Sequence, residues 1–194
     1  MKTIYFKQID ALLHNLVPRE LAGFEPYRLR RSSRAPCNIE RTDRIFRRTV
    51  RDGFDLFIVF CPNPRQEELY VDLAWSTKGR FPCDIQRPSV ILSPGRTELC
   101  QEEAFFGCDQ LFTRETGKSH TGWAVWRCSV DINDPNFRRV FVQEDMAPVT
   151  DEQAHNRAES AVSQCLADIK VILMPYFDEL VQRKLLESGS DNSQ

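Results

Sequence analysis

Apolar residues recur at three- and four-residue spacing near both ends of the chain. In the first of these segments the apolar positions run from Phe6 to Val17, which predicts an amphipathic helix. Pro18 either ends this helix or opens a short extra turn. Gly23 is a natural stop, because glycine accepts the left-handed backbone that follows many helices.

The second segment predicts a long C-terminal helix. It opens with a capping box, in which Thr150 and Gln153 each bind a backbone N–H of the first turn. An apolar stripe follows, made of Ala154, Ala158, Ala161, Cys165, Ile169, Ile172, Tyr176 and Leu180. Pro175 interrupts the stripe, so we expect the helix to kink or divide there. Residues 188–194 are expected to form a disordered polar tail.

Period-two patterns replace the helical spacing in the middle of the chain. Asp52 and Gly53 separate two strand-like runs, Arg44–Val50 and Phe54–Phe60. Asp-Gly in this position favours a tight hairpin. A third run, Leu69–Trp75, alternates cleanly between apolar and more polar positions. These runs predict an antiparallel meander of three strands.

The remaining pattern completes a prediction of fold class. Two further strands are expected at Ala104–Thr113 and Gly122–Val130, and a sixth at Arg139–Val142. The irregular connection before them can hold a short strand at Ser89–Leu92. Two helices that bracket such a run predict an α+β fold, with an antiparallel sheet of five to six strands and both helices packed on one face. No repeat or composition break divides the chain, so residues 1–187 are expected to form a single globular α+β domain.

The first half of the chain also has a layout that resembles a known family. A leading helix, Gly23-Phe24, an arginine-bearing strand at Arg44–Arg47, an apolar strand and Leu69–Leu73 follow one another over about residues 4–82. This order is similar to that of an uncharacterised family of small bacterial α+β domains, number 4304 among the domains of unknown function. The resemblance supports the fold class and implies no activity.

Charge is distributed unevenly along the chain. Nine arginines lie between positions 28 and 51: Arg28, Arg30, Arg31, Arg34, Arg41, Arg44, Arg47, Arg48 and Arg51. Only Glu40 and Asp43 oppose them, so this window carries a formal +7, and the remainder of a chain of net charge −2 carries −9. A basic segment of this kind favours an acidic partner, which can be nucleic acid, a phosphorylated ligand or an acidic protein face.

We therefore predict a partner-binding surface within the arginine-rich segment. Its members are Arg44, Arg47, Arg48 and Arg51 of the hairpin, with Arg31 and Arg34 of the loop before it. Neither face of the Arg44–Arg51 run is cleanly apolar, which is typical of an edge strand, where charge also blocks edge-to-edge aggregation. Edge protection and pairing with the acidic remainder of the molecule are the structural alternative.

A second cationic segment follows the third predicted strand. Trp75, Lys78 and Arg80 lie among hydroxyl residues and Gly79, which together are the ingredients of an anion-binding turn. The alternative is an ordinary polar loop at the end of a strand.

The sequence contains no complete catalytic motif. The triplet at 117–119 lacks the first glycine of a phosphate-binding loop, because position 112 is Phe112, and it is interpreted as a turn. His120 and His155 are available bases, but no Gly-x-Ser-x-Gly motif accompanies them. The sequence therefore predicts no cofactor and favours a non-enzymatic function.

A metal-dependent nuclease is the enzymatic alternative. Asp55, Glu68 and Asp72 lie in or near predicted strands, and Lys78 follows. Strand carboxylates with a nearby lysine are typical of Mg²⁺-assisted phosphodiester cleavage. The Glu-x-Lys of such sites is missing from the next strand, so this alternative is the weaker one.

Cysteine usage and the N-terminus indicate a cytoplasmic protein. The seven cysteines are scattered singly and match no zinc-binding spacing, so we expect reduced structural thiols and no metal. The N-terminus has no apolar signal-peptide core, and no run of about 20 apolar residues predicts a membrane span.

These observations favour a non-enzymatic intracellular binding module whose arginine-rich hairpin and loop engage an acidic protein partner, as an immunity-type or accessory protein does. A nucleic-acid-binding protein is the alternative, with Tyr27, Phe46 and Trp75 as candidate aromatics for stacking on bases. The net charge of −2 counts against it, because nucleic-acid-binding domains usually present a basic stripe or a basic whole. The sequence indicates neither the partner's identity nor the oligomeric state.

Overall fold

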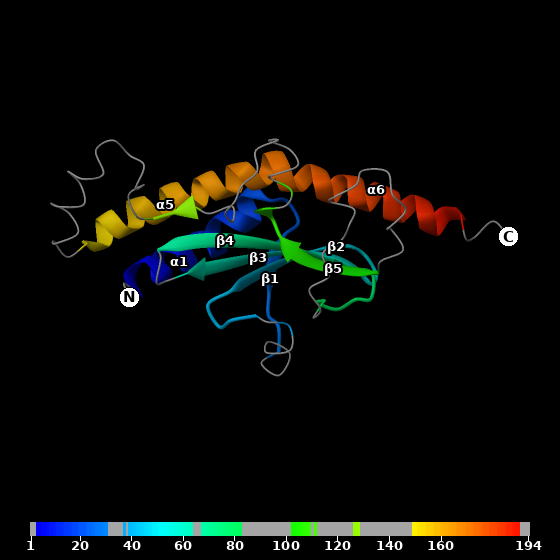
Figure 1. Cartoon of the computed structure of the whole chain (residues 1–194), viewed down its shortest axis with the longest axis horizontal. Helices are drawn as coiled ribbons and strands as arrows, with labels where there is room; N and C mark the ends of the chain where they lie inside the picture. The colour runs from blue at the N-terminus through cyan, green and yellow to red at the C-terminus, as the bar shows by residue number, and fades with distance from the viewer. Residues whose placement is uncertain are drawn as a thin grey trace.

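A computed structural model describes residues 3–30, 37, 39–63, 67–82, 102–109, 111, 126–128 and 149–190. Within these residues, one antiparallel sheet is covered on one face by helices (Figure 1). Its strands are β1 (Glu25–Tyr27), β2 (Arg44–Arg51), β3 (Phe54–Asn63), β4 (Glu68–Ser76), β5 (Glu103–Gly107) and β6 (Trp126–Arg127). The first five are neighbours in chain order, and β6 pairs with β4. The predicted α+β fold is confirmed.

The helical layer consists of one N-terminal helix and one longer, continuous C-terminal helical segment. The helix α1 (Thr3–Glu20) packs against α5 (Asp151–Asp168). A five-residue π-helical segment, η3 (Ile169–Leu173), joins α5 to α6 (Met174–Ser190). In Figure 1 the α5 and α6 helices lie end to end along one side of the sheet. Among the described residues, no helix combines the length and the apolarity that crossing a membrane requires.

The N-terminal helix does not end at Pro18 but continues into the short extra turn that the sequence allowed. It continues through Pro18 to Glu20, and the backbone N–H of Leu21 binds the carbonyl of Val17 at 2.9 Å. Gly23 then adopts a φ of +81°, the left-handed conformation that glycine accepts without strain. The predicted stop at Gly23 is therefore confirmed.

The long C-terminal helix begins as the sequence predicts and passes Pro175 without dividing. The capping box of Thr150 and Gln153 is present in full. Ahead of Pro175 the backbone widens into η3, where the N–H of Met174 binds the carbonyl of Ile169, five residues back. Proline has no N–H for the preceding turn, and one π turn accommodates this loss without a break. The helix α6 extends to Ser190, so residues 188–190 of the expected polar tail are helical.

The predicted hairpin and the strand that follows it are also confirmed. Gly53 turns the chain between β2 and β3 with a φ of +78°. The register shifts between Thr49 and Arg51, which is the mark of a β-bulge. In β4, Leu69, Val71, Leu73 and Trp75 all face the helices, as their alternation predicts.

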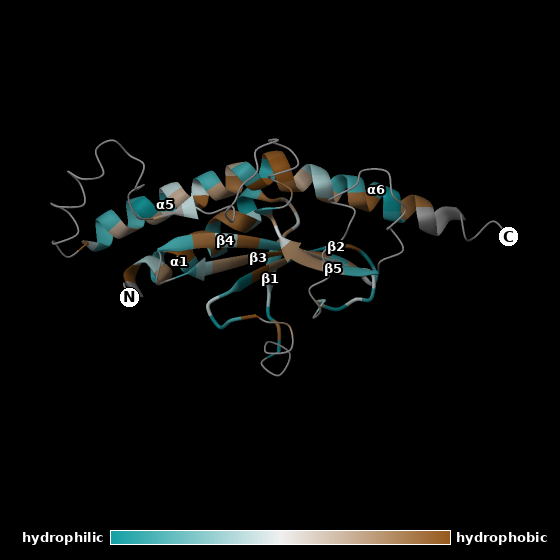
Figure 2. Ribbon diagram, viewed as in Figure 1, coloured by the Kyte–Doolittle hydropathy of each residue, from teal (hydrophilic) through white to brown (hydrophobic). Residues whose placement is uncertain are grey.

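The sheet is apolar on both faces. Toward the helices, Phe46, Leu56, Ile58 and Phe60 join the main core. On the opposite face a second cluster combines Ile45, Phe57, Val59, Ala74 and Phe105 with Cys37, Ile39 and Phe81 from outside the strands. Hydrophilic and hydrophobic residues alternate along α5 and α6, as expected for helices with one face on a core (Figure 2). The second cluster means that this face is covered in part by the segment between β1 and β2.

The cysteines differ from the prediction at one position. Cys37 is fully buried in the second cluster and is disulfide-bonded. Cys61, Cys108, Cys128 and Cys165 are free thiols, as expected. The expectation that every cysteine is reduced is therefore wrong for Cys37. When cysteines are scattered singly along a chain, their spacing carries no information about which thiols the fold brings together.

Several predictions fall partly or wholly outside the described residues. The strands expected at Ser89–Leu92 and Arg139–Val142, the triplet at 117–119, His120, Arg31, Arg34 and residues 191–194 all lie outside them. The strand expected at Ala104–Thr113 corresponds to β5, which ends at Gly107, and within Gly122–Val130 the described strand is β6.

Candidate functional site

The arginines of β2 divide between the two faces of the sheet. Strand alternation sends Arg44 and Arg48 to the side of the helices, with Phe46 between them in the main core. It sends Arg47 to the opposite side, with Ile45 in the second cluster. The bulge breaks the alternation after Thr49, so Arg51 pairs with Phe54, a residue of the main core. The four hairpin arginines that the sequence grouped together therefore belong to two separate environments.

The strand β2 is an edge along only part of its length. The three-residue β1 pairs with it from Ile45 to Arg47. From Arg48 to Arg51, the described strands provide a neighbour only on the β3 side. A bulge and charged residues occupy this uncovered part, and both features discourage pairing with a strand of another molecule. The edge prediction therefore holds for the second half of β2.

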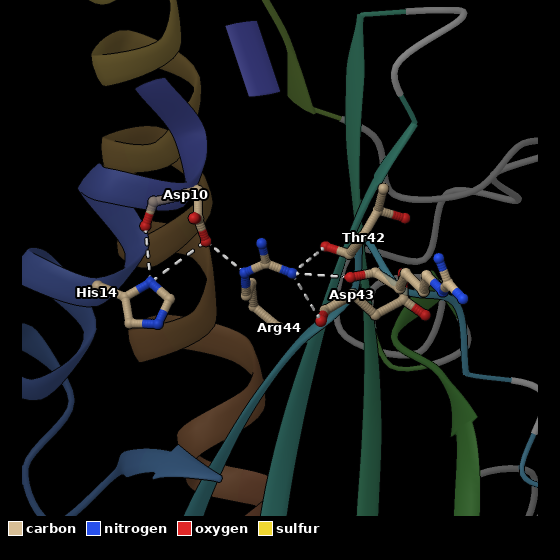
Figure 3. A network of polar contacts seen from close by, with 6 residues as sticks. Asp10, His14, Thr42, Asp43 and Arg44 are labelled. Atoms are coloured by element: carbon tan, nitrogen blue, oxygen red, sulfur yellow. Dashed lines mark hydrogen bonds and ion pairs between the residues drawn. The ribbon is translucent and has the colours of Figure 1, made fainter. Parts of the chain in front are cut away.

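Arg44 anchors the start of β2 to the N-terminal helix (Figure 3). Its Nε donates to the carboxylate of Asp10 in α1. Its Nη1 donates to three successive carbonyl oxygens, those of Arg41 at 3.1 Å, Thr42 at 2.9 Å and Asp43 at 3.2 Å. The guanidinium is thus committed to the fold, and only 21% of the side chain remains exposed.

Two further residues of α1 complete this anchor. The Phe6 ring lies beneath the Arg44 guanidinium, with Cζ 5.1 Å from its centroid. His14 places Nδ1 3.3 Å from Oδ1 of Asp10 (Figure 3), and its ring meets Phe46 edge to face. The anchor therefore joins charge, ring and backbone contacts around one guanidinium.

Arg48 plays a similar part farther along the same face. Its Nη2 lies 3.6 Å from Oδ1 of Asp178 in α6, and its Cζ lies 5.2 Å from the centroid of the Phe24 ring. Its side chain is 22% exposed. Arg44 and Arg48 thus tie β2 to the first and last helices, which is the structural alternative named above for this cluster.

Arg47, on the opposite face, is more open. It is 43% exposed, and its Cζ lies 5.0 Å from the ring centroid of Tyr27 in β1. Its Nε is 3.9 Å from Oδ1 of Asp55, a buried carboxylate that also accepts a 2.6 Å hydrogen bond from Thr49. The Tyr27 ring restrains the guanidinium while leaving part of it accessible.

Sequence reasoning missed the aromatic partner of each of these three arginines. Phe6, Phe24 and Tyr27 all come from the first 27 residues of the chain. Their pairing with β2 depends on how α1 and β1 dock against the hairpin, which local spacing does not reveal.

The remaining described arginines of the window from position 28 to position 51 lie at or beyond the ends of β1 and β2. Arg28 and Arg30 follow β1, Arg41 precedes β2, and all three are exposed. Within the described residues, none of these three side chains contacts a carboxylate. Arg51 is exposed at the hairpin end. We call Arg28, Arg30, Arg41 and Arg47 the arginine edge.

The predicted anion-binding turn has its cations paired with carboxylates. Nζ of Lys78 lies 2.7 Å from Oε2 of Glu102, and Arg80 donates two 2.9 Å hydrogen bonds to Glu103. The bonds from Arg80, followed by that from Ser76, hold the pKa of Glu103 below its ordinary value despite partial burial. An incoming anion would have to displace both carboxylates.

Trp75, the third residue predicted for this turn, lies away from its surface. It is 2% exposed in the main core, where Nζ of Lys184 lies 5.4 Å from its ring centroid. Phe46 is fully buried in the same core. Of the three aromatics considered for stacking on bases, only Tyr27 belongs to the face of the arginine edge.

The carboxylates considered for a nuclease do not converge. Cross-strand pairing places Asp55 level with position 76 of β4. In β4, Asp72 lies four residues before position 76, and Glu68 lies four residues before Asp72. Each step of four residues is about 13 Å along a strand. Lys78 is paired with Glu102. Within the described residues, no group of three or more His, Cys, Asp or Glu side chains is placed to hold a metal ion.

His155, the second histidine considered as a base, is exposed on α5. Its Nδ1 lies 3.0 Å from Oε1 of Gln8, and its Nε2 lies 4.0 Å from Oε2 of Glu159. These contacts are those of a surface histidine between two helices.

Comparisons with protein-family models, curated proteins and solved structures gave no match to this chain. The layout-level resemblance described above stays a prediction.

Proposed function

We propose that the protein is a non-enzymatic binding module that engages an acidic protein partner through the arginine edge. The observation that carries the proposal is the division of the arginines. Arg44 and Arg48 are committed to the helices, whereas Arg28, Arg30 and Arg41 are exposed and contact no carboxylate in the described part of the chain. Guanidinium groups bind carboxylates in a bidentate geometry, which suits them to an acidic protein surface.

Within this surface, we expect Arg47 to contribute most to the binding of the partner. Its guanidinium rests on the ring of Tyr27. A restrained side chain loses less conformational entropy on binding than a mobile one. Arginine and tyrosine are also the residues that contribute most often to the energetic centre of protein interfaces.

A protein partner fits this surface better than nucleic acid. Proteins that bind single strands usually present several aromatic rings beside their cations, and here Phe46 and Trp75 are buried in the opposite core. The −9 carried outside the arginine-rich window would also repel a phosphate backbone within the screening length of about 8–10 Å. An acidic protein that covers only this edge avoids most of that repulsion.

Site-specific photo-cross-linking in cells of the native host tests the proposal. A photoreactive amino acid replaces Glu25, an exposed residue that pairs with Arg47 across β1 and β2. A matched variant carries the same group at Ser163, an exposed position on α5. We expect a discrete protein adduct from position 25, absent from position 163, whose identified partner has an acidic contact surface.

Two results would overturn the proposal. An adduct at position 25 that disappears on nuclease treatment would identify a nucleic-acid-binding protein. Equal adducts from positions 25 and 163 would show that the arginine edge has no special role in binding.

A further inference from the structure

Arg47 of β2 rests on side chains from both neighbouring strands. Its Cζ lies 5.0 Å from the ring centroid of Tyr27, the last residue of β1. The Tyr27 ring meets Phe57 of β3 edge to face, with ring centroids 5.4 Å apart. Phe57 is fully buried in the second cluster and pairs with Arg47 across β2 and β3. The ring that contacts the guanidinium is therefore itself held by the core of this face.

A buried carboxylate adjoins the same guanidinium. Asp55 of β3 is 4% exposed, and its Oδ1 lies 3.9 Å from Nε of Arg47, which is an ion-pair distance. The same oxygen accepts the 2.6 Å hydrogen bond from the Thr49 hydroxyl, which fixes the carboxylate in place. Water screens a buried charge less than an exposed one, so its attraction for a neighbouring cation is stronger. Asp55 therefore holds the Nε side of the planar guanidinium toward the sheet.

These contacts orient Arg47 without using its hydrogen-bond donors. At 3.9 Å no hydrogen bond joins Arg47 to Asp55. Within the described residues, Arg47 pairs with no second carboxylate, although Glu25 lies directly across from it in β1. The two Nη groups form the outer edge of the guanidinium, where parallel N–H donors match the two oxygens of one carboxylate.

We propose that Tyr27 and Asp55 hold Arg47 as a binding site for a single carboxylate, which is an aspartate or glutamate side chain of the partner and binds through the two Nη groups. This inference rests on the proposed function and adds the chemical group that the partner presents. Tyr27 and Asp55 are positioning residues, because they act through Arg47. A guanidinium that is already oriented loses less conformational entropy when the carboxylate binds.

Nitrogen NMR of the guanidinium groups in the free, unmodified protein tests the positioning. Rotation about the Nε–Cζ bond averages the Nη signals of a mobile arginine, whereas a held guanidinium gives separate signals. We expect separate Nη signals for Arg47 and averaged signals for Arg41, an exposed arginine of the same edge. Averaged signals for Arg47 in the wild type would overturn the proposal.

The same measurement in Asp55→Asn separates the charge of Asp55 from its shape. Asparagine keeps an oxygen that accepts from the Thr49 hydroxyl, but it removes the negative charge beside Nε of Arg47. We expect the separate Arg47 signals to merge in this variant. Signals that remain as well separated as in the wild type would contradict the positioning role of Asp55.

Arg47→Lys tests the binding mode, because lysine keeps the charge and lacks the fork of two Nη groups. The readout is the yield of the photo-cross-link from position 25, next to Arg47 across β1 and β2. We expect the yield to fall by about tenfold, the loss that follows when one charge-assisted hydrogen bond is removed. In the matched control, Arg41→Lys, the yield should stay within about twofold of the wild type.

The inference and the proposed function fail separately in this experiment. A wild-type yield from Arg47→Lys, or an equal loss from Arg41→Lys, would overturn the carboxylate site and leave the arginine edge as a general cationic surface. Absence of any adduct from position 25 in the otherwise unchanged protein would overturn the proposed function, and this inference with it.

Discussion

Arg44 and Arg47 lie three residues apart in one strand, yet they have different surroundings. Arg44 faces the helices, where Asp10 and three backbone carbonyls bind its guanidinium. Arg47 faces the opposite side, where it rests on Tyr27 and remains 43% exposed. The comparison teaches that a cluster of like charges in sequence need not be a cluster in space. In a strand, residue parity decides which charges the fold uses and which it presents.

The two sets also differ in what their removal should change. A guanidinium that binds several oxygens of the fold contributes to stability, because its loss removes a hydrogen-bond donor from each of them. An exposed guanidinium contributes little to stability, since surface charge pairs are worth about 0–1 kcal/mol. Substitution can therefore separate the structural arginines from those of the arginine edge.

The largest effect is expected for Arg44→Ala. The substitution leaves Asp10 and the carbonyls of residues 41–43 without their donor and removes the contact with Phe6. We expect the free energy of unfolding to fall by about 3 kcal/mol, as measured by urea denaturation. The matched control is Arg41→Ala, an exposed neighbour, with a change under about 0.5 kcal/mol. Equal effects of the two substitutions would contradict the structural role of Arg44.

A smaller loss is expected for Arg48→Ala. This arginine contacts the ring of Phe24 and lies 3.6 Å from Asp178, whose carboxylate is 64% exposed. We expect a loss of about 1 kcal/mol, mostly from the ring contact. Asp178→Ala, measured in the same way, should change stability by less than Arg48→Ala. The reverse order would assign the stabilisation to the ion pair instead.

The smallest change in stability is expected for the triple variant Arg28→Glu, Arg30→Glu and Arg41→Glu. These side chains are exposed and contact no carboxylate in the described part of the chain. We expect a change in unfolding free energy under about 0.5 kcal/mol per position, measured by urea denaturation. A loss as large as that for Arg44→Ala would show that the arginine edge is also structural.

Local patterns were sufficient to predict most of the described fold. The Asp52-Gly53 turn, the alternation of β4 and the capping box of Thr150 each depend on residues within one turn or one strand. Such short-range signals need no knowledge of the rest of the molecule. The π turn before Pro175 could not be predicted, because a kink, a break and a π turn each accommodate a proline that has no backbone N–H.

The site was harder to predict than the fold. The pairing of Arg44 with Asp10 and that of Arg48 with Asp178 join residues far apart in the chain. They depend on the docking of helices against β2, which no local spacing encodes. The alternation of β2 did separate Arg44 and Arg48 from Arg47, but it could not show which face the helices would cover. It was wrong for Arg51, because the bulge shifts this residue to the face of Phe54.

The most direct test of the account measures the photo-cross-link from position 25 in the triple variant, with Arg28, Arg30 and Arg41 reversed to Glu. The account predicts that the protein adduct is lost while the unfolding free energy stays at the wild-type value. An adduct of undiminished yield in the folded triple variant would contradict the proposal that the arginine edge binds the partner.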